Sequence, residues 1–185
     1  GEIYHRYILG LYKIHDGIVK THPDILFEGC SGGGGRFDGG MLTYFPQIWC
    51  SDNTDAPSRL KIHYGTSFAY PIRKIRTNIK EKKKKKTKRE VSWKTRAVTA
   101  MHGTFGYELD PSQMTVEERQ ECAKYSEFYR EHSQLITEGD YYRLSSPYDD
   151  SIYVAWQFVS KDKAKSLVFV VTEDISIIDK NSYVH

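Results

Sequence analysis

The sequence predicts an α/β fold that is followed, from about residue 140, by a small domain of antiparallel β-strands. Two observations indicate the α/β part. Short apolar segments alternate with helical segments, and polar, glycine-rich or acidic residues follow the apolar segments directly. Strands that alternate with helices are typical of parallel sheets, whose binding sites lie just beyond the carboxyl ends of the strands. A third observation, three β-rich segments separated by turns after Gly139, indicates the second domain.

The elements of the α/β part are predicted from apolar spacing and from residues that begin or end helices. The first helix carries apolar residues at the three- and four-residue spacing of one buried stripe, and Pro23 follows its end. Pro57 suits the first turn of the second helix. The predicted elements are, in order, a helix at 3–20, short buried strands at 25–27 and 47–50, a helix at 58–64 and a strand at 67–70.

The remaining elements are a long helix and the three strands of the second domain. Thr115 and Glu118 have the spacing of a capping box, which predicts the start of a helix over 115–136. The β-rich segments that follow lie at 141–144, 152–159 and 166–172. We therefore expect two domains, at 1–139 and 140–185.

Length and cysteine content restrict the classes of protein to which the chain can belong. At 185 residues it is shorter than the roughly 250 of a complete (β/α)8 barrel, and it begins with Gly1 inside a helical pattern, as expected of a fragment or a processed product. The odd cysteine count argues against a disulfide framework and favours the cytoplasm. No spacing indicates a metal or a cofactor, and no signal peptide or membrane-spanning run is evident.

The positive net charge comes from a single segment. The chain has 27 basic and 24 acidic residues, of which eight basic and two acidic residues lie within 80–90, so the remainder is slightly acidic. A lysine run can be a nuclear-localisation signal or a nucleic-acid patch. Here no aromatic residues are interleaved with the lysines, which favours a solvated loop and no nucleic-acid partner.

The densest groups of polar residues lie at 30–38 and 46–56. The glycine-rich loop at 31–35 could cradle a phosphate, but it lacks the following Gly-Lys-Ser/Thr and also fails the dinucleotide fingerprint. Its glycines more readily let a ligand approach the backbone. Asp52 and Asp55 follow the second strand. They suit either glycoside hydrolysis, which needs two carboxyl groups, or the capping of the next helix.

Several blocks of the chain are similar to consecutive blocks of family 36 glycoside hydrolases, which are α-galactosidases. They are GEIYHRYILG (1–10), FEGCSGGGGRFDGGMLTYFPQIW (27–49), SDNTDAPSRLKIHYGTS (51–67), MHGTFGYELD (101–110), GDYYRLSSP (139–147) and VAWQFVSKDKAKSLVF (154–169). They occur in family order with near-family spacing. The second and third blocks together form the most specific part of the resemblance.

The resemblance implies that residues 1–139 form the second half of a (β/α)8 TIM-type barrel. In this assignment residues 25–30 are the fifth barrel strand and residues 47–51 the sixth. The antiparallel strands from residue 140 would begin a small C-terminal β-sandwich domain. The activity implied is retaining hydrolysis of terminal α-galactosyl groups of raffinose-type oligosaccharides, by a complete enzyme that is a homo-oligomer without cofactor or membrane partner.

The resemblance also implies roles for individual residues. Asp52 is the general acid/base, and Cys30 and Gly33 contact the galactose together with it. The residues expected to hold these three in position, without contacting the galactose themselves, are Arg36, Trp49 and Asp55. The alternative role for Cys30 is structural, as a small apolar side chain buried in the core.

The chain departs from the family pattern in two places. The family nucleophile, an Asp in a Lys-Trp-Asp block, lies upstream of the match to Gly1, and without it no covalent intermediate can form. We therefore expect this chain alone to be inactive. In addition, a Lys-rich segment at 72–93 replaces a family block, through a frameshift, an altered exon boundary or a genuine insertion.

Two other functions stay open at this point. One is a galactose-binding relic that keeps the glycine loop but has lost its nucleophile. The other is a nucleic-acid binder that uses the lysine run.

Overall fold

The computed structural model describes residues 1–80 and 91–172. Its elements are α1 (Glu2–Thr21), β1 (Glu28–Gly29), α2 (Ser31–Gly34), α3 (Met41–Tyr44), β2 (Gln47–Ile48), α4 (Ala56–Thr66), η1 (Ile72–Lys74), β3 (Arg76–Lys80), α5 (Trp93–Ala100), β4 (Thr104–Glu108), η2 (Pro111–Gln113), α6 (Val116–Glu138), β5 (Asp140–Arg143), β6 (Tyr153–Val159) and β7 (Ser166–Thr172). None of the described helices is long and apolar enough to cross a membrane.

The first four strands are parallel and follow one another in chain order. β1 pairs with β2, and β3 pairs with β4 over five residues. A parallel bridge between Ile48 and Ile75 joins the two pairs. Helices lie between successive strands, as is usual for parallel connections. The carboxyl ends of the four strands therefore lie on the same side of the layer.

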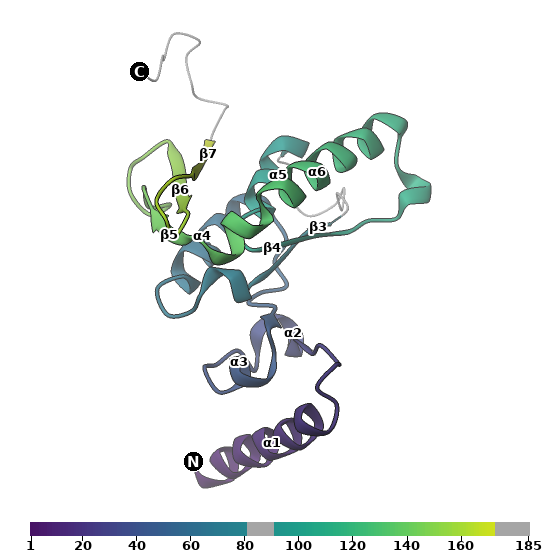
Figure 1. Ribbon diagram of the computed structural model, residues 1–185, viewed down its shortest axis with the longest axis vertical. Coiled ribbons are helices and arrows are strands. Elements are labelled where there is room, and N and C mark those ends of the chain that lie inside the picture. Colours follow the sequence, from purple (N-terminus) through teal and green to yellow (C-terminus); the bar gives the residue numbers. More distant parts are fainter. Residues whose placement is uncertain (81–90, 173–185) are drawn as a thin grey trace.

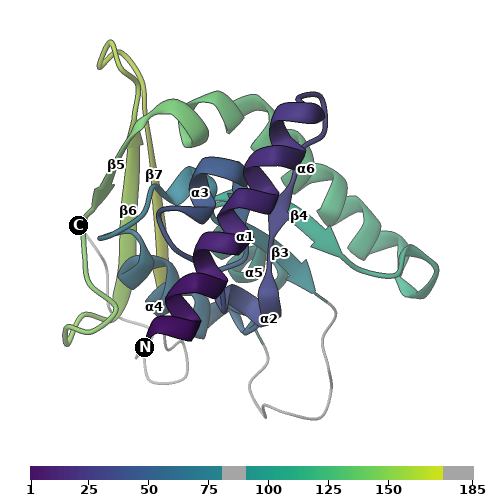
Figure 2. The same ribbon diagram turned by 90° about the horizontal axis from the view of Figure 1, so that it is seen from below.

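The last three strands form a separate antiparallel sheet in the order β5-β6-β7. It stands at one side of the molecule, with α6 leading into it (Figure 2). One face of this sheet is buried through Trp156, Phe158 and Phe169, whereas Val168 and Val170 are exposed on the other face. This alternation is the pattern expected of a sheet with one covered face.

The main core joins the parallel strands, their helices and the antiparallel sheet. Leu60, Ile75, Ile79 and Met101 lie in one cluster with Trp156. A smaller cluster around Met41 and Phe45 packs against α1, and α2 and α3 lie between α1 and the larger body (Figure 1).

Two buried histidines lie at the junction of the two sheets. His102 stacks on Trp156 with ring centroids 4.2 Å apart and is hydrogen-bonded to the Tyr141 hydroxyl at 2.6 Å. The rings of His63 and His102 are 5.2 Å apart, edge to face. Burial lowers the pKa of His102 to about 3 and also lowers that of His63. Both rings are therefore neutral at physiological pH.

Two of the predicted strands differ from the structure. Residues 67–70 are not a strand but the turn that ends α4, in which the amide of Phe68 donates to the Gly65 carbonyl. Residues 25–27 were expected to be buried, but the first strand is only Glu28–Gly29. Ile25 and Leu26 are 53% and 85% exposed, because no described element covers them.

The N-terminal part of the segment at 72–93, residues 72–80, contributes to the fold. Ile72, Ile75 and Ile79 are buried in the main core, and β3 is fully paired with β4. These residues are therefore not part of a solvated loop. The lysine run at 81–90 lies outside the described residues.

Candidate active site

The glycine-rich loop after β1 forms a left-handed turn. Ser31, Gly32, Gly33 and Gly34 all have positive φ, from 55° to 103°. The turn is closed by the amide of Gly34, which donates to the Cys30 carbonyl at 2.9 Å. Residues with a Cβ rarely adopt this conformation, so the glycines make the turn possible.

This loop packs directly against the loop that follows β2. A Cβ on Gly33 would lie 2.3 Å from the Asp52 amide nitrogen and 2.9 Å from its carboxylate Oδ1. A Cβ on Gly34 would lie 2.8 Å from the Cys50 carbonyl oxygen. The structure therefore brings Gly33 and Asp52 together at the carboxyl ends of two neighbouring parallel strands.

Asp52 and Asp55 have different surroundings. Asp55 is the N-cap of α4, and its Oδ2 accepts from the Ser58 amide at 3.2 Å and the Ser58 hydroxyl at 2.8 Å. The helix-capping alternative is thus confirmed for Asp55. Asp52 lies three residues before the cap and is exposed. Its carboxylate is therefore available to a ligand.

Cys30 is exposed at the start of the glycine loop and is a free thiol. The alternative interpretation of Cys30 as a small buried apolar side chain is therefore wrong. Arg36, at the far end of the loop, is also exposed. In residues 1–80 and 91–172, no hydrogen bond or ion pair joins Arg36 to Asp52, so the structure does not bring Arg36 into this group.

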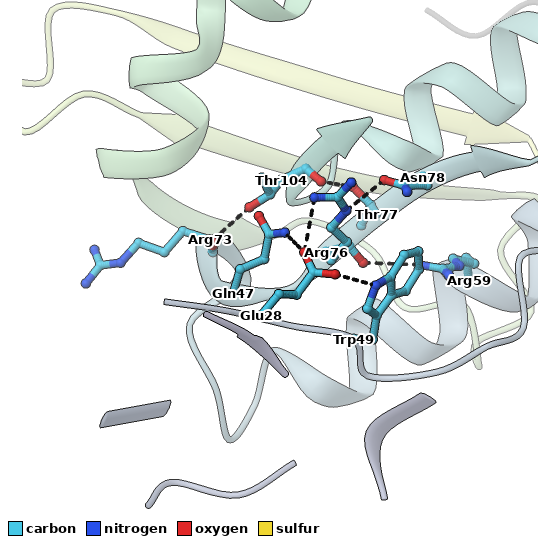
Figure 3. A network of polar contacts seen from close by, with 9 residues as sticks. All are labelled: Glu28, Gln47, Trp49, Arg59, Arg73, Arg76, Thr77, Asn78 and Thr104. Atoms are coloured by element: carbon cyan, nitrogen blue, oxygen red, sulfur yellow. Dashed lines mark hydrogen bonds and ion pairs between the residues drawn. The ribbon is translucent and has the colours of Figure 1, made fainter. Parts of the chain in front are cut away.

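Trp49 directly follows β2 and donates a hydrogen bond to Glu28, a residue that the sequence analysis did not identify. The Trp49 indole Nε1–H donates to Glu28 Oε1 at 2.9 Å, and the other carboxylate oxygen accepts from Arg76 Nη1 at 3.1 Å and from the Gln47 amide (Figure 3). This network joins β1, β2 and β3. Its signal in the sequence was a carboxylate directly after the predicted strand at 25–27, two residues before Cys30.

Arg59 is the second residue that the sequence did not single out. It lies on α4, is 2% exposed and donates to backbone carbonyl groups of the Asp52 loop. Its signal in the sequence was its position one helical turn after Asp55, on the same face of the helix.

The described residues contain no group of three or more His, Cys, Asp or Glu side chains that could hold a metal ion. The two loops place the exposed Asp52 carboxyl group against the Gly33 backbone at the carboxyl ends of parallel strands, and the exposed Cys30 begins the glycine loop. A sugar hydroxyl or glycosidic oxygen can approach such a group closely.

Comparison with known proteins supplies a family for this arrangement. Residues 1–139 match the family model described as Melibiase. The chain is 48% identical over 171 residues to the bifunctional alpha-galactosidase/sucrose kinase AgaSK of Mediterraneibacter gnavus, covering 92% of this chain and 18% of that protein. It is 50% identical over 167 residues to the alpha-galactosidase AgaA of Geobacillus stearothermophilus, covering 90% and 23%.

Solved structures agree with the sequence comparison. A crystal structure of a variant of the Geobacillus stearothermophilus AgaA in complex with raffinose superposes with a TM-score of 0.84 and 49% identity. The superposition covers 89% of this chain and 23% of that one. The chain therefore spans about a quarter or less of the length of these relatives.

Proposed function

Because the chain belongs to the melibiase family, we propose that it forms part of a retaining α-galactosidase of glycoside hydrolase family 36. The substrates of the complete enzyme are oligosaccharides with a terminal α-galactosyl group, of the raffinose type. The observation that carries this proposal is the contact between the glycine loop and Asp52, which unites the two most specific blocks of the resemblance.

In this proposal the four parallel strands are the last four of a (β/α)8 barrel, and residues 140–185 begin the C-terminal β domain. The parallel order β1-β2-β3-β4, with helices between the strands, supports this assignment. The site then lies at the carboxyl ends of the strands, where such barrels carry their active sites.

Asp52 acts as the general acid/base. As an acid it protonates the oxygen of the leaving group while a nucleophile from outside this chain attacks the anomeric carbon. As a base it then removes a proton from the water that hydrolyses the covalent galactosyl-enzyme. Cys30 and the backbone at Gly33 contact the galactose. The exposure of Cys30 and the close approach of Gly33 to Asp52 support this role.

Two further residues hold the loops of the site in position. Trp49 is held by Glu28, and Asp55 fixes the start of α4. Arg36 is proposed to support the glycine loop from its exposed position at the end of that loop, without a contact with Asp52.

The complete enzyme takes its nucleophile from a part of the protein outside this chain. We therefore propose that these 185 residues alone do not hydrolyse galactosides. We propose further that the complete enzyme is a homo-oligomer, and that its compartment is the cytoplasm, in keeping with three free cysteines.

The test compares leaving groups in the full gene product that contains this chain. Asp52→Asn removes the acid, so kcat/KM should fall on the order of 100-fold or more for raffinose, whose leaving group needs a proton. It should fall far less for p-nitrophenyl α-galactoside, whose leaving group does not. Asp16→Asn, on the surface of α1, is the matched control.

Equal losses on both substrates would refute the role of Asp52. Galactose binding by a wild-type protein without any turnover would instead identify the chain as part of a binding relic.

A further inference from the structure

We propose that Arg59 is a positioning residue for Asp52, and that it fixes the acid/base by binding the carbonyl groups on both sides of it. This inference rests on the proposed function, since it assumes that Asp52 is the general acid/base. The observation behind it is independent of that function. It is a buried guanidinium that donates to three backbone carbonyl oxygens and also lies 3.5 Å from the Nε2 of the buried, neutral His63 ring.

Arg59 binds the backbone of the two residues that flank Asp52 in the sequence. Its Nε donates to the Asn53 carbonyl at 2.7 Å, and its Nη2 donates to the Ser51 carbonyl at 3.2 Å. These are the residues immediately before and after Asp52. The planar guanidinium holds its donors in a fixed fork, so the two carbonyl groups are held at a fixed spacing.

The other side of the guanidinium is anchored to the body of the fold. Nη1 donates to the Arg76 carbonyl on β3 at 3.4 Å, and the guanidinium lies 5.1 Å from the centre of the Trp49 ring. Trp49 is in turn hydrogen-bonded to Glu28 on β1. Figure 3 shows Arg59 beside Trp49 at one end of this network. Arg59 thus joins the loop of Asp52 to three strands.

A buried positive charge with neutral partners is costly, which makes an ordinary packing role a poor account of Arg59. Arg59 is only 2% exposed, and within the described part of the chain no carboxylate forms an ion pair with it. Removing a guanidinium from water without a counter-ion carries a large penalty. Burial accordingly lowers the pKa of Arg59, and the nearby Cys50 and Asp52 side chains partly oppose this shift.

The consequence for catalysis follows from geometry. Asp52 itself is exposed, and its side chain is attached to a loop that lies outside any helix or strand. A general acid must lie within hydrogen-bond reach of the glycosidic oxygen, and a displacement of about 1 Å can cost on the order of 100-fold in rate. Without the fork of Arg59, the backbone on either side of Asp52 loses its anchor.

The experiment measures kcat/KM of the full gene product on raffinose and on p-nitrophenyl α-galactoside. Arg59→Lys keeps the charge but cannot bind both carbonyl groups in the same geometry, and Arg59→Met removes the charge. Arg119→Lys is the matched control, because Arg119 is an exposed arginine with a single carbonyl contact. Amide hydrogen exchange of residues 51–55 is followed in the same proteins.

We expect Arg59→Lys to lower kcat/KM on raffinose by about 10- to 100-fold, and on the aryl galactoside by less than about threefold, with faster exchange of the 51–55 amides. In an Asp52→Asn background, the same substitution should produce no further selective loss. This dependence on Asp52 is what a merely structural role would not produce.

Equal losses on both substrates, or no loss in Arg59→Lys, would overturn the inference while leaving the proposed function intact. A wild-type protein that hydrolyses neither substrate would overturn the proposed function, and the role of Arg59 with it. If Arg59→Met does not fold, Arg59→Lys still decides between these outcomes.

Discussion

Replacing Gly33 with alanine should displace Asp52, and the structure gives the size of the displacement. The new Cβ would lie 2.3 Å from the Asp52 amide nitrogen and 2.8 Å from its carboxyl carbon. Favourable contacts between heavy atoms need about 3.5–4.0 Å, so one of the two loops must move by about 1 Å or more. We therefore expect kcat/KM on raffinose to fall on the order of 100-fold in the full gene product.

Gly32→Ala is the matched control for this prediction. Gly32 has φ +64° and Gly33 has φ +71°, so both substitutions impose the same backbone strain, about 1–2 kcal/mol. A Cβ on Gly32, however, meets no atom within 4 Å. Steady-state kinetics and denaturation midpoints of both variants separate the two effects. If Gly33→Ala keeps kcat/KM within threefold of Gly32→Ala, the contact with Asp52 does not set the geometry of the site.

The remaining predictions concern stability. Asp55→Ala should lower the free energy of unfolding by about 1 kcal/mol, because α4 loses its N-cap. Asp55→Ser should retain most of that stability, and chemical denaturation measures both. Equal denaturation midpoints for the two variants would contradict the capping role. His63 and His102 stay neutral in the folded state, whereas both bind protons below about pH 6.5 when unfolded, so stability should fall as the pH drops from 6.5 toward 3, by up to about 1.4 kcal/mol per pH unit for each histidine. His102→Gln should flatten this slope, and an unchanged slope would contradict the assignment. Glu28→Ala should cost about 1 kcal/mol by removing the acceptor of the Trp49 indole N–H and of Arg76 Nη1, and no change in midpoint would show that water replaces it.

The local parts of the site could be predicted from the sequence because their signals are local. Pro57 and Asp55 set the start of α4 within a few residues of each other, and a run of glycines can only serve a turn or a close approach. The juxtaposition of Gly33 and Asp52 was accessible for another reason. Both follow strands of a predicted parallel sheet, whose carboxyl ends share one side.

The sequence does not predict β3, because the residues of this buried strand are mostly polar and prediction relies on apolar residues. In Arg76–Lys80 the side chains of Thr77 and Ile79 are buried, whereas Arg76 turns to the opposite face and meets Glu28. That partner is 48 positions away in the chain. The spacing of apolar residues cannot reveal a strand when a polar residue on one of its faces pairs with a partner so far away in the sequence.

The opposite error occurred at residues 67–70. Their apolar and aromatic character suggested a strand, but Phe68 is 64% exposed and Ser67 donates its hydroxyl to the Tyr64 carbonyl at the end of α4. The Arg143 guanidinium lies 4.0 Å from the Phe68 ring centre and supplies part of its cover. Tertiary contacts of this kind outweigh the local preference of four residues for a strand.

The most direct test of the central claim is the product that Asp52→Ala forms from p-nitrophenyl α-galactoside in the presence of azide. In a retaining enzyme that lacks its acid/base, the covalent intermediate accumulates, and azide attacks it without needing a base. Azide enters from the face that Asp52 would occupy, so we predict a faster turnover and α-galactosyl azide as the product. Turnover that azide does not accelerate, or the β-anomer as the product, would contradict the assignment of Asp52 as the general acid/base.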